Sequence, residues 1–118
     1  MRRPLLAVVL GAILLVGANT ALAAVPSELT IRWNAATENF GGRVRSSNDE
    51  CLAHRVVKVY KRTASGASLQ GMVMTNAEGR WKFHAMEAHG RYFGVTPRYE
   101  AMGDTVCGRD RSRTIDVM

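Results

Sequence analysis

Few side chains in this chain of 118 residues could catalyse a reaction. Three histidines, His54, His84 and His89, could act as general bases, but each would need a nucleophile and an acid brought to it by the fold. The sequence contains no nucleophile elbow, no phosphate-binding glycine loop and no H-E-x-x-H motif. We therefore predict that the protein is not an enzyme. A small secreted hydrolase that uses His84 or His89 is the alternative.

Metal-ligating residues are also sparse. Cys51 and His54 have the spacing of a ligand pair, but no second pair of this kind exists to complete a zinc site. Asp49 and Glu50 are the one adjacent acidic pair, and no loop of the calcium-binding type surrounds them. We expect neither a metal nor a cofactor.

The N-terminus has the pattern of a secretory signal peptide. Arg2 and Arg3 precede an uncharged apolar run, and Ala21-Leu22-Ala23 forms a small-x-small cleavage site. The apolar run is about a dozen residues, shorter than the roughly 20 that span a bilayer. We predict cleavage after residues 1–23, which leaves residues 24–118 as a single domain secreted to the periplasm or the medium. Loss of the two arginines lowers the formal net charge from +6 to +4.

The two cysteines, Cys51 and Cys107, both lie in the secreted part. An even pair of cysteines in an oxidising compartment predicts a disulfide. The bond would close a long loop, and loop-closure entropy would then stabilise this small domain by roughly 4 kcal/mol.

Basic residues form the one surface pattern that could bind a ligand. In the predicted strands, Lys58 and Arg62 share an outward face with Tyr60, and Arg80 and Lys82 share another. Neighbouring basic faces would attract an anionic cell-envelope polymer, a glycan or a surface protein. Secretion argues against nucleic acid as the native ligand. An ordinary solvated β surface would carry the same charges, since outward charges also protect sheet edges. The candidate binding residues are Lys58, Tyr60, Arg62, Arg80 and Lys82.

The elements that would position these residues are short strands. Apolar and polar residues alternate, and Gly, Asn, Ser and Pro separate the segments, with no sustained helical period. About seven strands at regular spacing predict an all-β, Ig-like sandwich. The expected strands cover 28–33, 40–45, 55–62, 69–75, 80–84, 91–96 and 112–117.

The predicted core follows from the same alternation. Asn76 and Gly79 form a turn, after which Trp81 and Phe83 alternate with basic residues. We expect Tyr60 and Phe93 to be the exposed aromatic residues. The expected core residues are Val57, Val59, Trp81, Phe83, Tyr92 and Ile115.

A series of motifs carries a family resemblance. In chain order they are Cys51, Arg55-x-Val57-x-Val59-Tyr60, Thr75-Asn76-x-x-Gly79-Arg80-Trp81-x-Phe83, Gly90-x-Tyr92, Cys107 and Ser112-x-Thr114-Ile115-x-Val117. From about Phe40 to Val117 the chain resembles the small prealbumin-like (transthyretin-like) sandwiches, kin to carboxypeptidase regulatory domains and Cna-B-type surface modules. The resemblance implies a seven-stranded sandwich that is usually non-catalytic and has a structural or adhesive role. No C-terminal Tyr-Arg-Gly-Ser signature is present, so hormone binding and hydroxyisourate hydrolysis are not implied.

Overall fold

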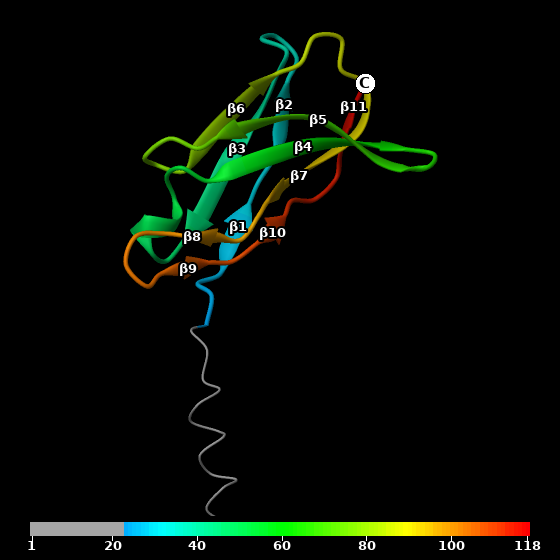
Figure 1. Ribbon diagram of the computed structural model, residues 1–118. Helices are drawn as coiled ribbons and strands as arrows, with labels where there is room; N and C mark the ends of the chain where they lie inside the picture. Colours follow the sequence, from blue (N-terminus) through cyan, green and yellow to red (C-terminus); the bar gives the residue numbers. More distant parts are fainter. Residues whose placement is uncertain (1–22) are drawn as a thin grey trace, which may run out of the picture.

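The computed structural model describes residues 23–118, which fold into two antiparallel β-sheets that pack face to face (Figure 1). The predicted all-β sandwich is confirmed, whereas the predicted signal peptide, except for Ala23, lies outside the described residues. The first sheet contains β1 (Ser27–Leu29), β2 (Arg32–Asn34), β3 (Asn39–Ser46) and β6 (Arg80–His84). The second sheet contains β4 (Val56–Thr63), β5 (Gly66–Met74), β7 (Gly90–Thr96), β10 (Asp110–Arg111) and β11 (Ile115–Val117).

Each sheet has a continuous centre and a broken edge. In the first sheet, β3 pairs with β6 on one side and with β1 and β2 on the other. In the second sheet, the order runs from β5 through β4 and β7 to β10, and β11 also pairs with β7. The strands β1 and β2 pair with the same edge of β3 in one unbroken register, and β10 and β11 pair with the same edge of β7. If each of these pairs is counted as one interrupted strand, the sandwich has seven strands.

The two broken edges correct the prediction of single strands over 28–33 and 112–117. In the first, the Thr30 hydroxyl accepts the hydrogen bond from the Arg43 amide at 3.0 Å, where a main-chain carbonyl would continue the ladder. In the second, the Ser112 hydroxyl accepts from the Gly94 amide at 2.8 Å, and the register shifts by one residue between β10 and β11. A hydroxyl side chain that replaces the backbone in this way interrupts a regular strand.

The core lies between the sheets and is built from alternating residues. Val57 and Val59 of β4 are fully buried, and they face Phe40 and Val44 of β3 across the sandwich. Trp81 and Tyr92 are also buried, while the partly buried Phe83 and Ile115 pack against this cluster. The Phe40 ring lies 4.7 Å from the Tyr92 ring and 4.7 Å from the Trp33 ring, so aromatic contacts join both sheets.

Two segments outside the predicted strands contain short regular structure. The segment before Cys51 ends in a 3-10 turn, Asp49–Cys51, which is capped by Asn48. Farther along the chain, β8 (Tyr99–Glu100) pairs with β9 (Val106–Cys107) as a separate ribbon. Both additions lie beside the disulfide between Cys51 and Cys107, which fixes their ends.

Candidate functional site

The structure divides the five candidate ligand-binding residues between two faces of the sandwich. Lys58, Tyr60 and Arg62 lie on β4 in the second sheet, where they alternate with inward-facing valines. Arg80 and Lys82 lie on β6 in the first sheet, where they alternate with the inward Trp81. Because each set points away from the core of the same two-layer sandwich, the five residues do not form one basic surface.

An aromatic pair and two arginines occupy the outer face of the second sheet. The Tyr60 and Phe93 rings stack with their centroids 5.3 Å apart. The guanidinium carbons of Arg111 and Arg62 lie 4.1 Å and 5.2 Å from the centroid of the Phe93 ring. The prediction that Phe93 is exposed is wrong: only 6% of the residue is accessible, because the arginines cover its ring. This face is a closed stack rather than an open aromatic platform.

The outer face of the first sheet carries a different feature, an open groove of about 750 Å³. Its cationic side chains are Arg32, Arg43, Arg80 and Lys82, and the main chain of Gly42 forms part of its floor. A smaller hollow continues from it past Gly41 and shares Arg32 and Lys82. We call these four cations and the two glycines the basic groove.

The strand register explains how residues far apart in the sequence meet in the basic groove. Arg43 of β3 lies directly opposite Arg80 of β6. Gly41 lies opposite Lys82 on one side and opposite Arg32 of β2 on the other. Since Gly41 has no side chain, the backbone is bare between two cationic residues. The groove is therefore a row of cations beside a stretch of backbone that carries no side chains.

Negative charge is absent from the lining of the basic groove. Its lining residues include no Asp or Glu in either the main hollow or the continuation. Within residues 23–118, the three ion pairs involve Arg45, Arg91 and Arg98, and none of the four groove cations. The site can therefore supply positive charge and hydrogen-bond donors to an anion.

A tight turn brings Arg80 to its place in the groove. The Asn76 side-chain oxygen accepts hydrogen bonds from the amides of Glu78 and Arg80, at 3.0 Å and 2.9 Å. Gly79 has a φ of 85°, which is in the left-handed region that favours glycine. Its carbonyl accepts from the Val44 amide at 2.7 Å, which ties the turn to β3. The turn predicted from Asn76 and Gly79 thus sets where β6 begins.

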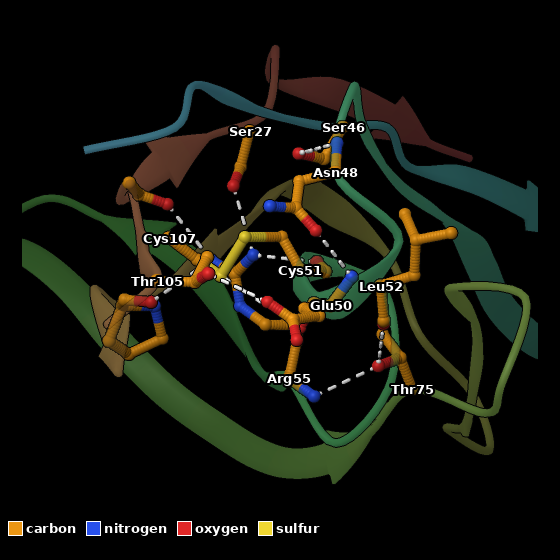
Figure 2. The surroundings of a disulfide bond; sticks show 12 residues. Ser27, Ser46, Asn48, Glu50, Cys51, Leu52, Arg55, Thr75, Thr105 and Cys107 are labelled. Atoms are coloured by element: carbon orange, nitrogen blue, oxygen red, sulfur yellow. Dashed lines mark hydrogen bonds between the residues drawn. A yellow bond between two sulfur atoms is a disulfide. The ribbon is translucent and has the colours of Figure 1, made fainter. Parts of the chain in front are cut away.

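A second polar site lies inside the domain, beside the disulfide (Figure 2). Cys51 and Cys107 are bonded, with their Cα atoms 5.5 Å apart, which confirms the predicted pairing. The disulfide indicates an oxidising compartment. The guanidinium of Arg55 lies next to this bond and is fully buried. Burial lowers the pKa of Arg55, and the neighbouring Tyr99 acts in the opposite direction.

Neutral oxygens surround the Arg55 guanidinium. Nη1 donates to the Ser27 hydroxyl and to the Cys51 carbonyl, both at 2.9 Å. Nη2 donates to the carbonyls of Pro97 and Gly108, at 3.2 Å and 2.9 Å. The side chain therefore joins four separate segments of the chain around the disulfide. Its position is structural, because a fully buried group cannot contact an external ligand.

The alternation of β4 contained the signal for this burial. Arg55 has the same parity as Val57 and Val59, which both face inward. The sequence prediction treated Arg55 as the first residue of a strand and assigned it no role. An arginine on the inward face of an apolar strand is a position at which buried carbonyl partners should be expected.

The two histidines of the hydrolase alternative, His84 and His89, have partners that do not provide catalytic chemistry. Nδ1 of His84 lies 3.1 Å from the side-chain oxygen of Asn39, and Nδ1 of His89 lies 3.3 Å from the Glu87 carbonyl. An amide and a main-chain carbonyl supply neither a nucleophile nor an acid. In the part of the chain that the structure describes, no group of three or more His, Cys, Asp or Glu could hold a metal ion.

Comparisons with protein-family models, with curated proteins and with solved structures found no match for this chain. Among residues 23–118, no helix has the length and apolar character needed to cross a membrane.

Proposed function

We propose that the protein is a secreted, non-catalytic β-sandwich module that binds an anionic polymer of the cell envelope through the basic groove. The observation that carries the proposal is the Arg43–Arg80 pair, which lies directly opposite in the register with no acidic residue in the groove. Like charges opposite each other on neighbouring strands destabilise a sheet. An anion held between the two guanidinium groups would remove this repulsion.

The shape of the groove favours a polymer over a small molecule. The basic groove is open, and it continues along the sheet toward Asn34, Thr37 and Asn39. Arginine presents a planar fork of donors that matches phosphate and carboxylate oxygens in pairs. Three arginines and a lysine along one sheet face could therefore contact successive anionic groups of an extended chain.

Export and family kinship belong to the same proposal. The N-terminal pattern of residues 1–23 supports secretion, and the disulfide is consistent with it. The motif order supports kinship with prealbumin-like sandwiches, which usually act as structural or adhesive modules. Either role would be met by a small domain that attaches to an anionic envelope polymer without changing it chemically.

Binding of the purified protein to immobilised polyphosphate, titrated with salt, tests this proposal. We expect retention that weakens as salt increases, because counterion screening competes with phosphate contacts. The variant Arg43→Gln/Arg80→Gln should lose at least about tenfold in affinity, the effect of one lost charge-assisted hydrogen bond. Neutral dextran should not retain the protein.

The matched control is Lys58→Gln/Arg62→Gln, which removes the same charge from the opposite face. We expect it to retain nearly the affinity of the unchanged protein, since neither residue lies in the basic groove. Equal losses in the two double variants would show that net charge alone governs retention and would reject the groove as the site. Affinity unchanged in both variants would reject the polyanion as the ligand class.

A further inference from the structure

The sandwich has four free edges, and three of them carry features that prevent pairing with another chain. The edge strand β6 carries Arg80 and Lys82. The edge formed by β1 and β2 is interrupted, as is the edge formed by β10 and β11, and each piece has at most three residues. Charges, short strands and irregularities are the usual protection of a sheet edge.

The fourth edge, β5, is long and uncharged, and a single β-bulge opposite Tyr60 interrupts it. It is the outermost strand of the second sheet, has nine residues and contains no charged side chain. Its residues 66–70 are all exposed. Figure 1 shows that the β4–β5 hairpin extends beyond the neighbouring strands. A long, uncharged edge of this kind is a template for pairing with a further strand.

An apolar stripe lies along the outer face of β5. Met74, Met72 and Leu69 lie opposite Val56, Lys58 and Tyr60, and they are 57%, 58% and 49% exposed. The register shifts near Tyr60, so that Gln70 is an extra residue on β5. Without this bulge Leu69 would point toward the core, because alternate residues face opposite sides. The bulge thus keeps three large apolar side chains on one exposed face.

We propose that β5 pairs antiparallel with β5 of a second copy, so that the two second sheets form one continuous sheet. The contact would be isologous, with the same strand supplied by each copy around a two-fold axis. The two apolar stripes would lie side by side at the axis and exclude water from each other.

The charge distribution favours a second copy as the occupant. The secreted domain has a formal net charge of +4 after loss of Arg2 and Arg3, so most self-contacts would bring like charges together. The strand β5 contributes no charge to the contact, and the cations of the neighbouring strand β4, which are Lys58, Lys61 and Arg62, lie one strand farther in. Across the axis, the two β4 strands would be three strand spacings apart, about 14 Å. This separation exceeds the Debye length of about 8 Å at physiological salt.

The antiparallel arrangement would also link two copies of the basic groove in one dimer, with one groove at each end of the contact. Met74 and Thr75, at the end of β5, line the groove, so each groove begins beside the proposed contact. Two linked sites on one polymer raise the apparent affinity without any new contact. Self-association itself does not depend on the identity of the ligand.

Sedimentation equilibrium of the purified protein, from low micromolar to the highest soluble concentration, tests the proposal with two matched variants. Met72→Lys places a charge on the stripe, and Met102→Lys places the same charge at an 85% exposed position away from β5. We expect dimers of the unchanged protein and of Met102→Lys, and loss of the dimer in Met72→Lys. Both variants should keep the melting temperature of the monomer fold, since both positions are exposed.

A monomeric unchanged protein over the whole concentration range would overturn the proposal, as would a dimer that persists in Met72→Lys. Hydrogen exchange provides a second measurement. The amides of β5 that point away from β4 should exchange slowly in the dimer and rapidly in Met72→Lys. A dimer in which residues 66–74 stay unprotected would place the contact elsewhere and reject pairing through β5.

Discussion

At the scale of the residue, Arg55 shows how one cation can hold a loop-rich end of a domain together. Its guanidinium contacts segments that include Ser27, Cys51, Pro97 and Gly108. These segments include parts of the chain outside the central strands, where backbone carbonyls lack ladder partners. A buried arginine has several donors and can satisfy several of these carbonyls at once. The hydrogen bonds offset the desolvation that lowers the pKa of Arg55.

Replacement of Arg55 should therefore destabilise the protein strongly. Arg55→Leu removes the donors for one buried and two partly buried carbonyls, and we expect a loss of roughly 3–5 kcal/mol in the free energy of unfolding. Urea unfolding followed by circular dichroism measures this loss. Arg98→Leu is the control, because its exposed ion pair with Glu100 should contribute about 1 kcal/mol or less. A similar small loss in both variants would contradict a structural role for Arg55.

At the scale of the element, the turn between β5 and β6 links stability to the basic groove. The Asn76 side chain accepts from two main-chain amides, including that of Arg80. The turn therefore fixes the first residue of β6 opposite Arg43. A looser turn would leave Arg80 free to move away from the groove.

Asn76→Ala should lower both stability and binding. We expect a loss of about 1–2 kcal/mol in the free energy of unfolding, the usual effect of losing such a side-chain acceptor. Retention on polyphosphate should weaken as well, since Arg80 loses its fixed position.

Asn48→Ala provides the matched control for this turn. Asn48 also accepts from a main-chain amide, that of Glu50 at 2.8 Å, but it does not line the groove. It should lower stability and leave retention unchanged. Equal effects of both variants on retention would mean that the Asn76 turn has no particular part in binding.

At the scale of the whole molecule, the disulfide joins the connection between β3 and β4 to the β8–β9 ribbon. Cys51 precedes β4 and Cys107 ends β9, at a sequence separation of 56. Both cysteines are fully buried beside Arg55. The bond thus restricts the conformations of the unfolded chain. It also anchors the end of the sandwich at which β8 and β9 lie.

Loss of the disulfide should lower the melting temperature substantially. Loop closure contributes roughly 4 kcal/mol for a loop of this length, which corresponds to a decrease of roughly 15–30 °C in a domain of this size. Calorimetry with and without reductant measures the effect, and Cys51→Ala/Cys107→Ala should reproduce it. Reductant should not change the melting temperature of that double variant. Identical melting curves of the oxidised and reduced protein would refute the stabilising role.

Three features could be predicted from the sequence alone: the inward and outward alternation of residues along the strands, the disulfide and the fold class. The inward positions of Val57, Val59 and Trp81 could be predicted because strand periodicity is a local property of the sequence. It can be recognised without knowing which strands pair. The pairing of Cys51 with Cys107 followed from their number and from the predicted compartment. These features required no knowledge of contacts between distant segments.

The tertiary structure alone decided which basic residues share a surface. Arg43 and Arg80 meet because β3 pairs with β6, and Lys58 is separated from them because β4 belongs to the other sheet. The burial of Phe93 beneath Arg111, and the exposure of β5 as an edge, depend likewise on strand order. Strand order is set by the packing of the whole core, so residues in a single strand carry little information about it.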